Sequence, residues 1–129
     1  MKYFVDNDIS PRFAKMLVSL GVEIVALRDC IPSDTQDCDF LADLKKVHGA
    51  DVFISNNTAQ RTNPIESRLL KQSGVTSLYF MPFWSKLKFW PQAQWLLNHW
   101  EMLDGFAAGA AAGTCADIQS NRRCRTFHL

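Results

Sequence analysis

The sequence lacks several features that would assign a protein to a class directly. Its 129 residues carry a formal net charge of only +1, so no strong overall field directs it to nucleic acid or membranes, and any nucleic-acid site must be a local patch. No apolar run reaches the roughly 18 residues of a membrane span, and the N-terminus resembles a strand rather than a signal peptide. The cysteines form no C-x-x-C pair, which indicates neither a zinc nor a redox motif. We therefore expect reduced thiols in a cytoplasmic protein at the four cysteines: Cys30, Cys38, Cys115 and Cys124.

The composition is that of an ordinary globular protein. Hydrophobic residues make up 47% of the chain and charged residues 21%. A chain of this length suffices for one domain that buries about two-thirds of its unfolded surface. We expect a single domain over residues 1–129, with its core in residues 1–103 and a small-residue segment and β-hairpin in residues 104–129.

Strand and helix patterns alternate along most of the chain. Short apolar runs predict strands at residues 3–5, 22–27, 52–55 and 75–81. Helical spacing and capping residues predict helices at residues 11–20, 33–49, 64–72 and 91–103. This order predicts an α/β fold, a three-layer α/β/α sandwich with a largely parallel central sheet. Residues 82–91 are expected to form an aromatic loop with two lysines. Small residues that indicate no particular element fill 105–113, and a hairpin of residues 114–119 and 123–129 could add edge strands.

The first eleven residues, MKYFVDNDISP, contain the most informative pattern. A buried strand over Tyr3–Val5 is followed by Asp6 and Asp8, and Ser10 and Pro11 then begin a helix. Ligands bind at the carboxyl ends of strands in open α/β sheets, and two carboxylates there suit a hard divalent cation such as Mg²⁺. The alternative is that both aspartates are simple turn residues.

Further polar residues are expected at the same edge of the sheet. Asp37 continues the apolar stripe of the helix over 33–49 toward its N-terminal end, although an acidic residue there also interacts favourably with the helix dipole. Asn56 and Asn57 follow the strand over 52–55. Clustered carboxylates repel one another unless a cation or proton compensates them, and Mg²⁺ or Mn²⁺ would do so and could activate water for phosphodiester cleavage. Three arginines flank the predicted site and could hold phosphates: Arg12, Arg28 and Arg61.

Two other surfaces have open interpretations. The helix over 91–103 has a core stripe that includes Leu97 and Trp100. A second, partly apolar stripe includes Trp95, His99 and Met102, which indicates either deep burial or an interface with a partner. His99 is a core-edge or contact residue in this view rather than a metal ligand. The arginines of the C-terminal hairpin, Arg122, Arg123 and Arg125, form either a solvated turn or a contact to RNA phosphates.

Four segments, in this order, carry a resemblance to a known family. They are FVDNDISP, LRDCIPSDTQDCDFL, VFISNN…RTNPIESRLLKQSG and FMPFWSKLKFWPQAQWLL, which together span most of residues 1–103. The chain resembles a PIN-like domain, and in particular the small bacterial PIN-like proteins that include VapC-type toxin ribonucleases. The hairpin tail matches less clearly.

The resemblance implies a metal-dependent endoribonuclease, the toxin of a toxin–antitoxin pair, with RNA as substrate and an antitoxin or a second copy of the chain as partner. The family's acidic positions fall on Asp6, Asp37 and Asn57, which implies catalytic roles for these residues and, with Asp8, a Mg²⁺ or Mn²⁺ site. Family members usually carry Asp where this chain has Asn57. Asn keeps one acceptor oxygen but loses the charge, which weakens a site for a hard cation. Asp8 could compensate, the chain could be a natural low-activity form, or Asn57 could be an engineered substitution.

Three other functions are compatible with parts of the pattern. A catalytically inactive PIN-like module that binds RNA or a partner protein is the main alternative, and Asn57 favours it. A phosphoacceptor receiver domain also carries paired acidic residues after its first strand, but it needs an aspartate at the end of the third strand, where this chain has asparagines. A purely structural α/β module is the remaining alternative.

Overall fold

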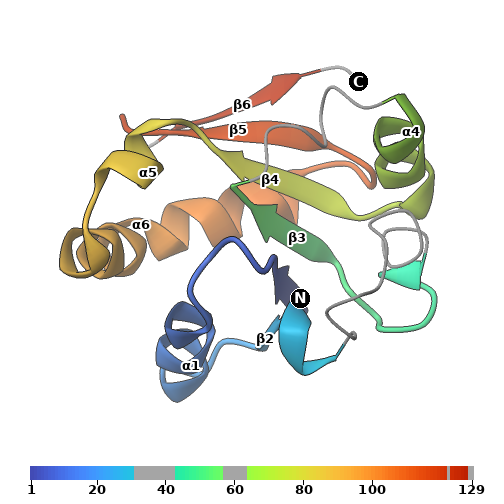
Figure 1. The fold of residues 1–129 in the computed structure, drawn as a ribbon. Helices are drawn as coiled ribbons and strands as arrows, with labels where there is room; N and C mark the ends of the chain where they lie inside the picture. Colours follow the sequence, from blue (N-terminus) through green and yellow to red (C-terminus); the bar gives the residue numbers. More distant parts are fainter. Residues whose placement is uncertain (31–42, 57–63, 122, 128–129) are drawn as a thin grey trace.

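A central β-sheet organises the molecule (Figure 1). The computed structural model describes residues 1–30, 43–56, 64–121 and 123–127. Within these ranges the sheet has six strands in the order β2-β1-β3-β4-β5-β6. The first five pair in parallel, and β6 runs antiparallel to β5. The strands are β1 (Tyr3–Val5), β2 (Ile24–Ala26), β3 (Val52–Ser55), β4 (Thr76–Phe80), β5 (Cys115–Gln119) and β6 (Arg123–Phe127).

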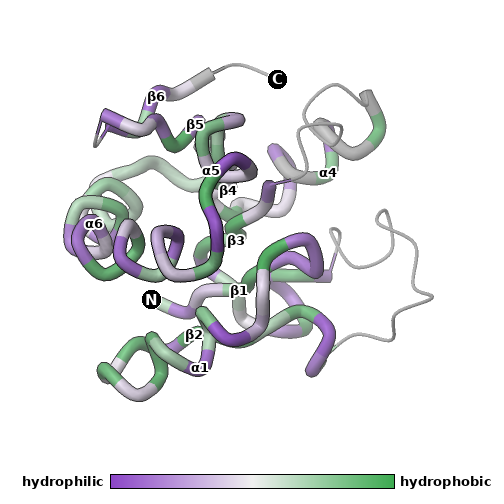
Figure 2. Tube along the Cα trace, turned by 60° about the vertical axis from the view of Figure 1, so that its left-hand side comes forward, coloured by the Kyte–Doolittle hydropathy of each residue, from purple (hydrophilic) through white to green (hydrophobic). Residues whose placement is uncertain are grey.

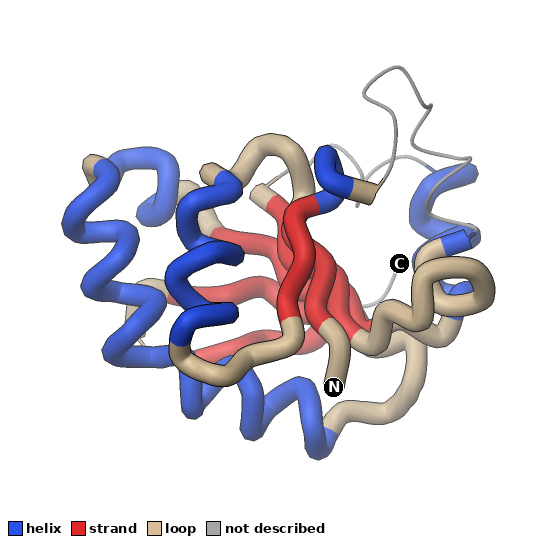
Figure 3. The backbone as a smooth tube through the Cα atoms, turned by 90° about the horizontal axis from the view of Figure 1, so that it is seen from below, coloured by secondary structure: helices blue, strands red, loops and turns tan. Residues whose placement is uncertain are grey.

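Helices lie on both sides of the strands (Figure 3). They are α1 (Pro11–Ser19), the short 3₁₀ helix η1 (Leu27–Asp29), α4 (Pro64–Ser73), α5 (Phe83–Lys86) and α6 (Phe89–Gly109). One apolar cluster joins α1 and α6 to one face of the sheet, and a second cluster joins Leu69 of α4 and the buried Leu44 to the other. The predicted three-layer α/β/α architecture with its C-terminal hairpin is therefore confirmed. Among the described residues, no helix is both long and apolar enough to cross a membrane.

The strands are apolar on both faces because helices cover both faces. Phe4 of β1 and Phe53 of β3 are fully buried in the cluster on the α4 side, whereas Tyr3 and Ile54 belong to the cluster on the α1 and α6 side. Parallel sheets that are covered on both faces need such nearly continuous apolar runs. The runs end at Ser55 and at the aspartate that follows β1, so polar groups begin at the carboxyl edge of the sheet.

Helix α1 begins as the sequence predicts. The Ser10 side chain accepts a hydrogen bond from the backbone N–H of Arg12, and Pro11 occupies the first helical position. Phe13 and Leu17 face the core and are 2% exposed, and in Figure 2 apolar and hydrophilic residues alternate along the helix. The start of α1 is thereby fixed directly after the loop that carries the two aspartates.

Helix α6 is longer than predicted, and the side of the helix that is buried differs from the predicted one. It begins at Phe89 and extends to Gly109, so part of the small-residue segment 105–113 is helical, and Ala107 is buried in the core. Trp95 is also buried, because it packs against Phe80, Phe83 and Trp84, whereas Leu97 is 47% exposed although it was expected in the core stripe. The aromatic groups of β4 and α5 thus widen the buried side of α6 toward Trp95.

Two shorter predictions also need correction. The predicted helix over 33–49 does not continue through its described part, because residues 44–48 form hydrogen-bonded turns that end at Gly49 with φ 70°. The segment 82–91 was expected as a loop, yet it contains α5 and the first turn of α6. Pro91 is compatible with that turn because the first N–H groups of a helix have no intrahelical acceptor.

Truncation of Phe80 should severely destabilise the fold. Its ring is 1% exposed and stacks on Trp84 with a centroid distance of 4.0 Å. Phe80→Ala should lower the free energy of unfolding by about 3–5 kcal/mol, as measured by urea denaturation. Val18→Ala is the control, because Val18 is 53% exposed and its loss should change stability by no more than about 0.5 kcal/mol. Equal effects of the two substitutions would contradict the placement of Phe80 in the core.

Candidate metal centre at the carboxyl edge of the sheet

Strands β1 and β3 bring the candidate site residues together. They pair in parallel, with Val5 opposite Ile54, and the ladder continues one step further where the backbone N–H of Asp6 donates to the Ile54 carbonyl at 2.9 Å. Asp6 therefore lies beside Ser55 at the point where both strands end. The predicted convergence of the residues that follow these two strands is confirmed for Asp8 and Asn56, whose backbone N–H donates to the Asp8 carboxylate.

The Asp6 carboxylate is buried and held by hydrogen bonds. Asp6 is only 8% exposed. Its Oδ2 accepts a hydrogen bond from the Ser55 hydroxyl at 2.8 Å, and its Oδ1 accepts one from the backbone N–H of Asn7 at 2.7 Å. A buried carboxylate with such partners has a fixed orientation, which is the condition for a precise ligand.

Asp8 faces the end of β3 from the other side of the loop. Both of its carboxylate oxygens lie 3.2 Å from the backbone N–H of Asn56, which donates to them. Loss of solvation and the negative charge of Asp6 raise the pKa of Asp8 from 3.8 to about 6, against the lowering effect of the Asn56 hydrogen bond. In the described part of the chain Asp8 forms no ion pair. Asp6 therefore lies close enough to Asp8 for its charge to contribute to the raised pKa of Asp8.

Helix α5 contacts the site through Asn56. The Asn56 side-chain amide donates to the Ser85 hydroxyl at 2.9 Å, while its backbone N–H binds Asp8. Sequence reasoning missed the roles of Ser55 and Ser85. Ser55 is detectable in principle, because it is a hydroxyl residue at the end of an otherwise apolar strand. No sequence pattern indicated Ser85, since its contact depends on how α5 folds back after β4.

Two of the three arginines predicted to hold phosphates, Arg12 and Arg28, lie within the described residues. A guanidinium N–H of Arg28 donates to the Asn7 carbonyl at 2.9 Å, so Arg28 stabilises the loop that carries both aspartates. The Arg12 guanidinium lies 5.2 Å from the centroid of the Phe89 ring, at the start of α6. Arg61 lies outside the described residues, as do Asp37 and Asn57.

The described donors of the predicted site suit a hard divalent cation. Asp6 and Asp8 supply carboxylate oxygens, and the cost of desolvating Asp8, with a smaller cost from the charge of Asp6, appears in the raised pKa of Asp8. A divalent cation between them would relieve that cost. The described residues contain no group of three or more His, Cys, Asp or Glu side chains placed to hold a metal. Two carboxylates are therefore the described part of the predicted four-residue site.

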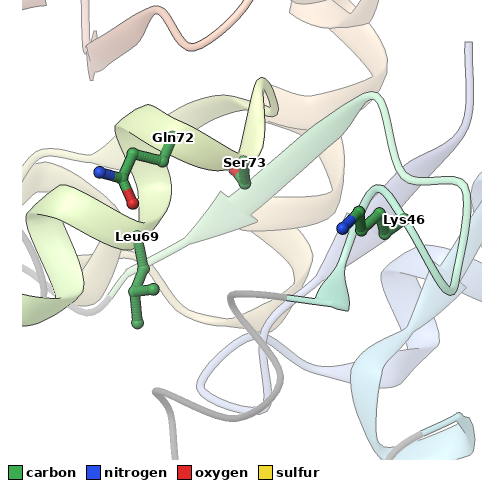
Figure 4. Close-up of a pocket in the computed structure, with 4 residues that line it drawn as sticks. All are labelled: Lys46, Leu69, Gln72 and Ser73. Atoms are coloured by element: carbon green, nitrogen blue, oxygen red, sulfur yellow. The ribbon is translucent and has the colours of Figure 1, made fainter.

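One described cavity lies elsewhere in the fold. A cavity of about 240 Å³ is lined by Lys46 from the turn before β3 and by Leu69, Gln72 and Ser73 from the second half of α4 (Figure 4). These residues precede β3 and β4 in the chain, so the cavity lies toward the amino edge of the sheet. It does not coincide with the aspartate pair.

The residues predicted to contact a partner have neighbours within the chain. Trp95 is buried in the protein's own core and leaves only 9% of its surface for another molecule. His99 and Met102 are half-buried, with the His99 Nδ1 2.8 Å from the Trp95 carbonyl oxygen and the Met102 sulfur 3.9 Å from the Cys124 Sγ of β6. A partner role for His99 and Met102 stays a prediction.

The coupling between the two aspartates can be tested by titration. Asp6→Asn removes the charge that raises the pKa of Asp8, so NMR should show the Asp8 carboxyl titrating below pH 6 in this variant. Asp51→Asn is the control, because Asp51 accepts hydrogen bonds from Lys2 and Lys45, outside the aspartate pair. In the native chain a raised pKa means that the folded state holds this proton more tightly, so Asp8 favours folding at low pH and loses that contribution as the pH rises through about 6. An Asp8 pKa that does not respond to Asp6→Asn would contradict the coupling.

Comparison with known proteins agrees with this architecture and adds its family. A family model described as a PIN-like domain matches residues 1–81, from the start of the chain through β4 to the residue after it. That range contains both aspartates and all the strands that position them. The search of curated proteins and the search of solved structures found no significant match. The match covers more than half of the 129 residues, and the chain accordingly belongs to the PIN-like domain family.

Proposed function

We propose that this protein is a metal-dependent endoribonuclease of the PIN-like type. PIN-like domains are commonly nucleases, which makes a nuclease the first expectation for this chain. The observation that carries the proposal is the pair of coupled carboxylates, Asp6 and Asp8, held at the carboxyl edge of the sheet by the pairing of β1 with β3. Asp37 and Asn57 are the further residues that we propose for the site.

Each described residue has a separate task in this proposal. Asp6, oriented by Ser55, and Asp8, oriented by Asn56, would bind Mg²⁺ or Mn²⁺. When bound, the cation would supply charge stabilisation for the phosphate and a water of lowered pKa. Arg28 already donates one N–H to Asn7 and would use its remaining donors for RNA phosphate, together with Arg12 and Arg61.

Asn57 would set the strength of this activity. An amide oxygen binds a hard cation less strongly than a carboxylate does, so a site with Asn57 should be weaker than one with Asp. Asp8 supplies a second carboxylate beside Asp6 and would compensate in part. We therefore propose an activity that is weak in the native chain and increased by Asn57→Asp.

The proposal includes a biological setting. As a toxin ribonuclease in the cytoplasm, the protein would be restrained by an antitoxin protein, and α6 offers the half-buried His99 and Met102 as contacts for it or for a second copy of the chain. The main alternative is an inactive PIN-like module that binds RNA or a partner protein without cutting. The replacement of the family's usual Asp by Asn57 is the observation that favours this alternative.

Metal affinity should depend on pH through Asp8. A carboxyl group must lose its proton before it binds a divalent cation, and the pKa of Asp8 is about 6. The affinity for Mn²⁺, measured by titration calorimetry, should therefore fall as the pH is lowered from 7 to 5. Asp8→Asn should weaken binding at pH 7 and remove most of this pH dependence. Strong Mn²⁺ binding that is the same at both pH values and in both proteins would exclude Asp8 as a ligand.

Cleavage of RNA is the direct test. Total RNA is incubated with the native protein, with Asn57→Asp, and with Asn57→Asp combined with Asp6→Asn, each in Mg²⁺, Mn²⁺ or EDTA. Discrete products should appear with metal, increase by about tenfold or more with Asn57→Asp, and disappear with Asp6→Asn or EDTA, because each change alters the metal site. If none of the folded proteins cuts any RNA tried, the catalytic proposal fails and the binding module takes its place.

A further inference from the structure

An exposed tryptophan stands close to the candidate site. Trp90, in the first turn of α6, is 74% exposed, whereas Trp84 and Trp95 are buried and Trp100 is half-buried. Its ring meets Phe89 edge to face, with a centroid distance of 5.6 Å and an interplanar angle of 78°. Large aromatic rings are rarely left in water without a partner, so this position requires an explanation beyond packing.

The surroundings of Trp90 are basic. Lys86 and Lys88 precede it in the chain, and residues 67–100 contain no aspartate or glutamate. Lys86, Lys88 and Arg12 are exposed, and none of them forms an ion pair with another described residue. We call Arg12, Lys86, Lys88, Phe89 and Trp90 the α5–α6 surface. Its charge is complementary to phosphate.

Two sets of contacts join the α5–α6 surface to the aspartate pair. Asn56, which binds Asp8 through its backbone, donates from its side chain to Ser85, the residue before Lys86. Arg12, four residues after Asp8, lies over the Phe89 ring at 5.2 Å. Figure 1 shows α5 and the start of α6 on the side toward which the arrowheads of β3 and β4 point.

The α5–α6 surface is also held in place. Phe89 stacks on Phe13 of α1 with a centroid distance of 5.1 Å, and the Gln92 side chain donates to the Trp84 carbonyl at 2.9 Å across the junction of α5 and α6. Trp90 is therefore an exposed ring on a rigid support. A ring of this kind can stack on a ligand at little cost in conformational entropy.

We propose that the α5–α6 surface binds single-stranded RNA beside the metal centre, with an unpaired base stacked on Trp90 and backbone phosphates on Arg12, Lys86 and Lys88. This inference rests on the proposed function, because it assigns a substrate class to the same site. Only an unpaired base offers its face to an indole, since the bases of a duplex are stacked on each other. The surface would thus select unpaired over paired RNA, whereas phosphate contacts alone would bind both.

Binding without cleavage tests the inference separately from catalysis. The full-length protein in EDTA is titrated into a fluorescein-labelled twelve-nucleotide oligouridine RNA and into an RNA duplex of equal length, and anisotropy gives Kd. The single strand should bind more tightly. Trp90→Ala should weaken its binding about 5- to 100-fold, the effect of losing one stacked base, while Trp90→Phe should retain most of the affinity.

A matched control and the salt dependence make the test specific. Leu97→Ala removes another exposed apolar side chain two turns further along α6 and should leave Kd unchanged. Lys86→Gln and Lys88→Gln should each reduce the slope of log K against log salt by about 0.7, the value for one phosphate contact of a single strand. Circular dichroism confirms that each variant is folded.

The outcomes separate this inference from the proposed function. Equal binding of single strand and duplex, or equal affinity of Trp90→Ala and Leu97→Ala, would overturn the inference even if metal-dependent cleavage is observed. A preference for the single strand that depends on Trp90 would support it. If that preference is seen and no variant cleaves RNA, only the catalytic proposal fails.

Discussion

The parallel pairing of β1 with β3 determines where Asp6 and Ser55 lie at the candidate site. It places Asp6 against Ile54 and Ser55, and the hydrogen bond from the Ser55 hydroxyl then orients the Asp6 carboxylate. The turn after β1 brings Asp8 back to the N–H of Asn56, so one strand pair supplies both carboxylates and the groups that hold them. A slip of this register by one residue would turn Asp6 toward the opposite face of the sheet and separate the pair.

The electrostatics of this edge follow from that geometry. The charged form of Asp8 carries a cost, because loss of solvation and, to a smaller extent, the buried charge of Asp6 raise its pKa. A proton or a divalent cation can offset it, and the two compete for the same carboxylate. The basic α5–α6 surface lies next to this edge but does not neutralise it, because none of its cations forms an ion pair with Asp8. Negative and positive groups thus remain separate, as the proposed binding of a cation and of phosphates requires.

Much of this arrangement could be predicted from sequence because it depends on local patterns and on strand order. Ser10 and Pro11 identify the start of α1, and the alternation of strands and helices implies that residues after β1 and β3 meet at one edge. The buried side of α6 could not be predicted, because it depends on how α5 folds back against Trp95 rather than on the spacing within the helix. Helical spacing alone gave the exposed Leu97 a core position and missed the helical extension to Gly109. The roles of Asp37 and Asn57 lie outside the described residues and stay predictions.

Asn56 connects the two halves of the proposed active surface. Its backbone N–H binds Asp8 and its side chain binds Ser85, so the carboxylate pair and α5 share one residue. Lys86 follows Ser85 directly, and α6 begins three residues later at Phe89. A shift of α5 would therefore alter the hydrogen bond that lowers the pKa of Asp8, and a change of charge at Asp8 would alter the support of α5. If the proposed binding of a cation and of RNA both occur, we expect them to be coupled through Asn56 rather than to act as independent events.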